Sequence, residues 1–122
     1  MDELEISAGH APCGKNAIPL ALEYIRKHCD SDITLEDVAK AAWLSPTYFS
    51  RLFVQTTGMH FSDYLRQCRL ERAKVLLATE SLSVKEIATA SGFRSAAYFI
   101  KLFSEAYGMT PGEYRRTNPF TD

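Results

Sequence analysis

The sequence predicts an all-α protein. Apolar residues recur at helical spacing in one segment after another, and no alternating strand pattern longer than a few residues appears in the 122-residue chain. Serine or threonine residues suited to helix starts precede most of these segments, and glycines follow several of them. The chain is 46% hydrophobic and 24% charged, which is close to the globular average and excludes wholesale disorder.

The first two helices are expected to follow a leader. Residues 1–15 show no periodicity and contain glycine and proline, so we expect them to be flexible. The apolar residues after Asn16 step by four, three and four along one helical face: Ile18, Leu22, Ile25 and Cys29. A short second helix is expected after Thr34, because Asp37 stands three residues further on, in the capping-box position.

The remaining helices begin and end with similar signals. Ser45 and Pro46 begin a third helix, because serine caps the first turn and proline there loses no hydrogen bond. Gly58 ends it as a residue free to adopt the left-handed conformation, and a long fourth helix is expected at about residues 61–79. Three further helices are bounded by Ser83 with Glu86, by Ser95 with Gly108, and by Thr110-Pro111 with Glu113, the last ending near Arg116.

An internal repeat organises these seven helices. Residues 34–41 align with residues 83–90, and after one inserted residue the Tyr-Phe-Ser-Arg-Leu-Phe of residues 48–53 aligns with the Tyr-Phe-Ile-Lys-Leu-Phe of residues 98–103. Each copy is a short capped helix, a turn of three or four residues and a longer helix. This is the outline of a helix-turn-helix, in which the second helix enters the major groove of DNA.

The long helix is expected to connect the two copies. Its apolar stripe changes side midway, which suits packing into one subdomain at its start and into another at its end. A length of about 27 Å would put the two recognition helices on the order of 34 Å apart, one turn of B-DNA. We therefore divide the chain into a first helix-turn-helix subdomain at 16–60, a connecting helix at 61–79 and a second subdomain at 80–118.

The charge distribution agrees with a nucleic-acid partner better than the net charge does. The net charge is −1, but residues 1–50 hold four Lys/Arg against eight Asp/Glu, whereas residues 51–122 hold ten against seven. Five Lys/Arg residues lie from Arg51 to Lys74, against only Asp63 and Glu71. This local basic band, rather than the overall charge, is the relevant electrostatic footprint for DNA binding.

The second helix of each copy presents two faces. On a helical wheel, one side of residues 46–57 carries Phe49, Leu52, Phe53 and Thr56, and the other carries Thr47, Ser50, Arg51 and Val54. We assign four phenylalanines to the core: Phe49, Phe53, Phe99 and Phe103. On the opposite face, Arg51 is the residue type best suited to bidentate contact with guanine.

The residues give less support to an enzyme, a metal site or a protein-interaction module than to a DNA-binding protein. No Gly-rich phosphate loop or nucleophile motif is present, so we expect neither catalysis nor a cofactor. His10 and Cys13 have ligand-like spacing but no partner pair, so we expect no metal site. A helical protein-interaction module without DNA binding stays open as the alternative. Binding to duplex DNA that weakens as salt rises would separate the two.

The location expected from the sequence is the cytoplasm. The three cysteines form no C-x-x-C motif, which fits a reducing compartment. No apolar run is long enough for a membrane span, and the N-terminus is acidic where a signal peptide would be basic.

Taken together, the motifs resemble the DNA-binding domain of AraC-type bacterial transcription regulators over residues 17–118. The residues that carry the resemblance are Leu35-Glu-Asp-Val-Ala, Leu44-Ser-Pro-x-Tyr-Phe-Ser-Arg-Leu-Phe with Gly58, Tyr64-Leu-x-x-Cys-Arg-Leu-x-x-Ala-x-x-Leu-Leu, Ile87-Ala, Gly92-Phe93, Tyr98-Phe-x-Lys-x-Phe and Gly108-Met-Thr-Pro-x-x-Tyr-Arg. The resemblance implies two homeodomain-like helix-turn-helix subdomains in tandem, reading two successive major-groove segments of a promoter or operator. It also implies RNA polymerase as a partner, and a monomeric isolated domain. Because the family usually adds a signal-receiving domain, we expect this chain to be an excised C-terminal domain or a short stand-alone regulator.

Carried over by position, the resemblance implies specific contact residues. The base-reading positions fall on Thr47, Ser50 and Arg51 in the first copy and on Ala96, Ala97, Ile100 and Lys101 in the second. Contacts to the DNA backbone are expected from Ser45, Arg66, Arg69, Arg72 and Ser95, although the three arginines could also support packing or remain solvated.

Two residues depart from the family pattern. Trp43 stands in the first turn where glycine is common, as Gly92 stands in the second copy. Because a left-handed conformation costs a large residue about 1–2 kcal/mol, we expect either a different turn or a Trp43 side chain packed as a lid. Ile100 occupies a groove position that is usually polar, which weakens hydrogen-bond readout by the second copy.

Overall fold

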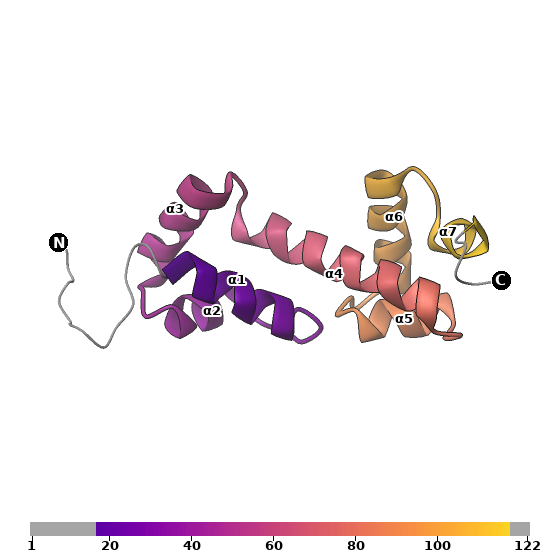
Figure 1. Ribbon diagram of the computed structural model, residues 1–122, viewed down its shortest axis with the longest axis horizontal. Helices are drawn as coiled ribbons and strands as arrows, with labels where there is room; N and C mark the ends of the chain where they lie inside the picture. Colours follow the sequence, from indigo (N-terminus) through magenta and orange to yellow (C-terminus); the bar gives the residue numbers. More distant parts are fainter. Residues whose placement is uncertain (1–16, 118–122) are drawn as a thin grey trace. The chain divides into compact units, whose positions relative to one another are not determined.

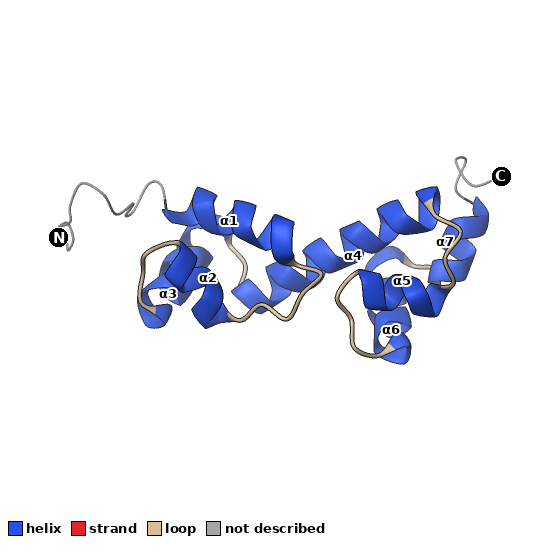
Figure 2. Ribbon diagram, turned by 90° about the horizontal axis from the view of Figure 1, so that it is seen from below, coloured by secondary structure: helices blue, strands red, loops and turns tan. Residues whose placement is uncertain are grey.

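The computed structural model describes residues 17–117, and this part of the chain contains seven helices and no strand (Figures 1 and 2). In chain order they are α1 (Ala17–His28), α2 (Leu35–Ala41), α3 (Pro46–Thr57), α4 (Phe61–Thr79), α5 (Val84–Ala90), α6 (Ala96–Tyr107) and α7 (Pro111–Thr117). The all-α prediction and each of the expected helices are confirmed. The expected leader, residues 1–15, lies outside the described residues.

Capping residues mark the ends of several helices. Thr34 and Ser83 each form a complete capping box, with Asp37 and Glu86 as the reciprocal partners. At the start of α7, hydrogen bonds from the backbone N–H and the hydroxyl of Thr110 lower the pKa of Glu113.

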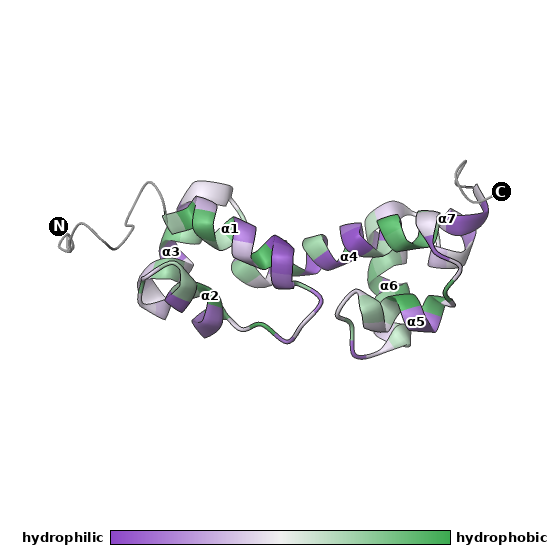
Figure 3. Ribbon diagram, turned by 60° about the horizontal axis from the view of Figure 1, so that its bottom comes forward, coloured by the Kyte–Doolittle hydropathy of each residue, from purple (hydrophilic) through white to green (hydrophobic). Residues whose placement is uncertain are grey.

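The described chain forms two compact units, each built on one helix-turn-helix. The first contains α1, α2, α3 and the start of α4 as far as Leu65, and the second contains Cys29–Ser31 and the chain from Arg66 onward. The division falls within α4, a continuous helix of 19 residues that carries hydrophilic and hydrophobic residues along its length (Figure 3). Consistent with the shift of its apolar stripe, Leu65 is buried in the first unit, and Leu70, Ala73 and Leu77 are buried in the second.

In the first unit, the rings of α3 form the centre of the core. Phe49 and Phe53 are fully buried with ring centroids 5.4 Å apart, and Phe61 packs edge-on against both. Helix α1 packs against α2 and α3 through the apolar face predicted from its periodicity, which includes Ile18 and Ile25. Removing one of these buried rings would cost about 3–5 kcal/mol, so they determine which side of α3 faces inward.

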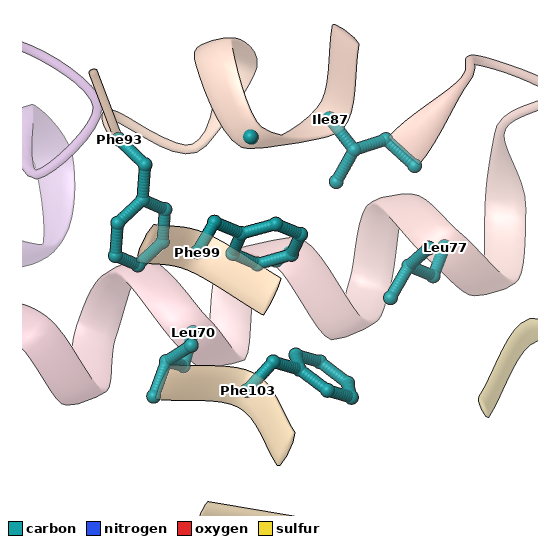
Figure 4. Close-up of a cluster of buried hydrophobic side chains, with 8 residues drawn as sticks. Leu70, Leu77, Ile87, Phe93, Phe99 and Phe103 are labelled. Carbon is teal, nitrogen blue, oxygen red and sulfur yellow. The ribbon is translucent and has the colours of Figure 1, made fainter. Parts of the chain in front are cut away.

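The second unit repeats this arrangement around α6. Figure 4 shows Phe99 and Phe103 of α6 between Leu70 and Leu77 of α4 and Ile87 of α5. Phe93, from the turn before α6, packs against Phe99 with ring centroids 5.1 Å apart. The prediction that all four repeat phenylalanines are core residues is confirmed, because each is 0% exposed.

The two helix-turn-helix turns share one backbone path although their residues differ. Trp43 has a φ of 64° and Gly92 a φ of 98°, so both adopt the left-handed conformation. In each turn the next residue donates a hydrogen bond back to the short helix, from Leu44 to the carbonyl of Ala39 and from Phe93 to that of Ala88. The expectation that Trp43 would change the turn or pack as a lid is therefore wrong, because its side chain is 63% exposed.

The space around the two turns differs. A Cβ at Gly92 would lie 2.5 Å from the carbonyl oxygen of Cys29 and 2.8 Å from Nε of Arg69, so glycine alone fits there. The exposed side chain of Trp43 meets no such barrier, and its strained backbone is held by the capping hydrogen bonds on either side.

We predict opposite effects of substitution at these two positions. Trp43→Gly should raise the free energy of unfolding by about 1 kcal/mol, because it relieves left-handed strain and removes little packing. Gly92→Ala should lower it by about 2 kcal/mol or more, because the added methyl group meets the backbone at Cys29. Urea unfolding followed by circular dichroism measures both effects without relying on Trp43, the only tryptophan. A loss of stability in Trp43→Gly would contradict the strain at this turn.

Candidate nucleic-acid interface

In the first unit, burial of one face of α3 leaves a polar face in solvent. With Phe49 and Phe53 fixed in the core, Thr47 and Arg51 are exposed, and Ser50 is half-buried beside them. Ser45 caps the helix, its Oγ accepting a hydrogen bond from the backbone N–H of Tyr48 at 3.3 Å. The three residues predicted to read bases from α3 thus share one helix face.

The assignment of Thr56 to the core side of α3 was wrong. Thr56 is exposed, and its neighbour Thr57 is the residue that turns inward. The hydroxyl of Thr57 donates to the carbonyl of Phe53 at 2.8 Å and accepts from the N–H of Met59 at 3.1 Å. Helix α3 ends here at Gly58, and these turn contacts decide which threonine is covered.

In the second unit, α6 exposes a face of different chemistry. Ala97 and Lys101 are exposed, Ile100 is 37% exposed, and Ala96 is half-buried at the start of the helix. Ser95 caps α6 as Ser45 caps α3, with its Oγ accepting from the N–H of Tyr98 at 3.1 Å. The four residues predicted for this helix supply methyl and branched apolar surface with one ammonium group.

The three arginines of α4 predicted near the DNA backbone have different surroundings. Arg69 donates from Nε to the carbonyl of Cys29 at 2.6 Å and from an Nη to that of Ser31 at 2.8 Å, all within the second unit. Arg72 forms an ion pair with Asp30 at 3.3 Å and stays partly exposed, and Arg66 is half-buried. Arg69 therefore has a structural role, whereas Arg72 keeps surface available to a ligand.

Sequence reasoning missed Tyr48 and Tyr98, which occupy equivalent positions of α3 and α6. Both side chains are exposed, at 45% and 48%. Each directly precedes a core phenylalanine in the sequence. Because neighbouring residues on a helix differ by about 100°, the first ring of each pair turns away from the core.

The described residues provide neither a metal-binding cluster nor a membrane-spanning helix. Residues 17–117 contain no group of three or more His, Cys, Asp or Glu side chains arranged to hold a metal ion. His10 and Cys13, the two residues with ligand-like spacing, lie outside this range. Among the described helices, none combines the length and the apolar character needed to cross a membrane.

Known proteins share both the sequence and the fold. Residues 38–117 match the family described as "Helix-turn-helix domain". The chain is 45% identical over 94 residues to the uncharacterized HTH-type transcriptional regulator YijO of Escherichia coli K12, covering 77% of this chain and 33% of YijO.

Two crystal structures have the same architecture. A transcriptional regulator of Chromobacterium violaceum, described as containing an AraC-type DNA-binding domain, aligns with a TM-score of 0.80 at 29% identity, covering 85% of this chain and 95% of that one. The DNA-binding domain of AdpA, solved in complex with a target DNA, aligns with a TM-score of 0.77 at 29% identity, covering 82% and 90% of the two chains.

The fold, the paired turns and these matches define a helix-turn-helix protein of the transcription-regulator class. Within that class, the chain belongs to the AraC-type family. It spans about a third of the length of YijO and of the regulatory protein PocR of Salmonella typhimurium, two curated relatives that it matches.

The contacts of the α4 arginines predict which of them the fold requires. Arg69→Ala should lower the free energy of unfolding by about 2 kcal/mol, because two carbonyls lose a charged donor. Arg72→Ala is the matched control and should cost less than about 1 kcal/mol, because its ion pair with Asp30 is partly exposed. Urea unfolding of both variants measures the difference. Equal costs would show that Arg69 does not hold the segment from Cys29 to Ser31.

Proposed function

We propose that this domain binds double-stranded promoter or operator DNA with sequence preference, as the DNA-reading part of a bacterial transcription regulator. The observation that carries the proposal is the pair of helix-turn-helix units within one chain, each exposing one face of its second helix. The AdpA domain, which shares this fold, was solved bound to a target DNA. In the proposed complex, α3 and α6 enter two successive major-groove segments of one duplex.

The face of α3 has the groups that discriminate bases by hydrogen bonding. The guanidinium of Arg51 can donate two hydrogen bonds to O6 and N7 of guanine, and the hydroxyls of Thr47 and Ser50 can donate or accept. Each good bidentate pair is worth about 1–3 kcal/mol against the wrong base. We expect α3 to set most of the sequence preference.

The face of α6 has fewer hydrogen-bonding groups and more apolar surface. Ala96, Ala97 and Ile100 can contact the C5-methyl group of thymine, and Lys101 can reach guanine or a phosphate. We expect the DNA segment under α6 to tolerate more sequences and to favour A·T pairs.

Contacts to phosphates supply affinity without sequence information. Residues 66–117 hold nine Lys/Arg against five Asp/Glu, so this stretch carries the positive charge. Arg66 and Arg72 are candidates for phosphate contacts, together with the hydroxyls of Ser45 and Ser95 at the starts of α3 and α6. We propose no phosphate contact for Arg69, whose guanidinium is engaged by two carbonyls.

The remaining parts of the proposal follow from the family. The isolated domain would bind as a monomer, because one chain already holds two recognition helices. Regulation would involve RNA polymerase in the cytoplasm, and the domain would need neither a cofactor nor catalysis.

Selection of bound sites from a random duplex library tests the function directly. The proposal expects enrichment of an asymmetric site of about two major-groove turns, and an affinity that falls steeply as salt rises. A helical protein-interaction module would enrich no sequence and would not bind duplex DNA even at low salt, and that result would exclude the proposed function.

Arg51 and Arg72 should affect binding in different ways. Arg51→Ala should weaken binding to the selected site by about 1–3 kcal/mol and relax the preference at one base pair. Arg72→Ala should weaken all duplexes similarly and reduce the slope of log affinity against log salt by about one. Titrations of the selected site and its single-base variants at several salt concentrations distinguish these effects. If Arg51→Ala leaves every base preference intact, the groove face of α3 is assigned incorrectly.

A further inference from the structure

Two exposed tyrosines differ from the other four in their contacts. All six tyrosines lie in the described residues, and four of them pack against another ring: Tyr24 on His28, Tyr64 on Phe53, and both Tyr107 and Tyr114 on Phe103. Within residues 17–117, Tyr48 and Tyr98 make neither a ring contact nor a side-chain hydrogen bond, and each side chain is exposed. Neither a ring contact nor a hydrogen bond within the described residues therefore accounts for a tyrosine at either position.

The repeat shows that this pair differs from its neighbours. Tyr48 and Tyr98 occupy the same position of α3 and α6, three residues after the capping serine, and the backbone N–H of each donates to that serine. The surrounding groove positions have diverged between the copies, from threonine to alanine, from serine to isoleucine and from arginine to lysine. An exposed tyrosine has stayed the same where every neighbouring base-reading residue has changed.

This pattern distinguishes two kinds of DNA contact. In the proposed complex the two helices read different bases, so the residues that read them are free to diverge between the copies. The sugar-phosphate backbone is the same in both segments, so a residue that contacts it can be the same in both copies. We propose that Tyr48 and Tyr98 donate phenolic hydrogen bonds to phosphate oxygens at equivalent places in the two DNA segments, an inference that rests on the proposed function.

The chemistry of the phenol suits this role. Its O–H is a neutral donor, and a phosphate oxygen is a charged acceptor, a combination stronger than a bond between two neutral groups. Both tyrosines lie in the first turn of a 12-residue helix, whose positive end also favours a phosphate. Because a phenol carries no charge, its contact would fix the helix in the groove without releasing a counterion.

Removal of each hydroxyl alone tests the proposal. Tyr48→Phe and Tyr98→Phe keep the ring and should each weaken binding to the selected site about tenfold, the loss expected for a hydrogen bond to a charged group. The loss should be equal for single-base variants of the site, and the salt slope should stay unchanged. Tyr24→Phe, which removes a hydroxyl from a tyrosine whose ring packs on His28, is the matched control and should leave affinity unchanged.

Replacement of single phosphates by an uncharged analogue shows which phosphate each tyrosine contacts. Replacing single phosphates of the selected site by methylphosphonates should weaken wild-type binding at one position for each tyrosine. The corresponding position should lose its sensitivity in the Tyr→Phe variant. Unchanged affinity in both variants would mean that the tyrosines are only solvated, and an altered base preference would mean that they read bases. Either result overturns the inference while wild-type DNA binding, and with it the proposed function, stands. No binding by the wild type would overturn both.

Discussion

The burial of two phenylalanines on each recognition helix is the interaction on which the rest of the arrangement depends. Phe49 and Phe53 fix the rotation of α3 about its axis, and Phe99 and Phe103 fix that of α6. Once these rings are in the core, the opposite side of each helix must face solvent, whatever residues it carries. The residues on the exposed side are consequently free to change. This explains how the same helix arrangement exposes Arg51 on α3 and Ile100 on α6.

The two helix-turn-helix turns accept different residues at the same backbone conformation. The same hydrogen bonds close both turns with a left-handed residue, yet tryptophan fills this position in the first unit and glycine in the second. The difference lies in the surroundings, because only Gly92 is crowded by backbone. A stable hydrogen-bonded turn can therefore hold Trp43 at a cost of about 1–2 kcal/mol, without a change in the path of the chain.

Features determined by near neighbours in the chain were predictable from the sequence. Capping residues and periodicity located every described helix, and the repeat identified the core rings. The outcome at Trp43 was not predictable, because it depends on whether hydrogen bonds outweigh local strain. The role of Arg69 was also hidden, because its partner carbonyls at Cys29 and Ser31 are about 40 positions away in the chain. The exposure of Tyr48 could have been predicted from the sequence, because neighbouring residues on a helix differ by about 100° and Phe49 is in the core.

In the proposed complex, one chain provides two non-equivalent recognition helices for one duplex. Sedimentation equilibrium of the domain on its selected site measures the number of chains bound per duplex. We expect a complex that contains one 13.7 kDa chain per duplex at saturation, on a site without two-fold symmetry. Two chains bound to a palindromic site, with no one-to-one complex at any ratio, would contradict this expectation.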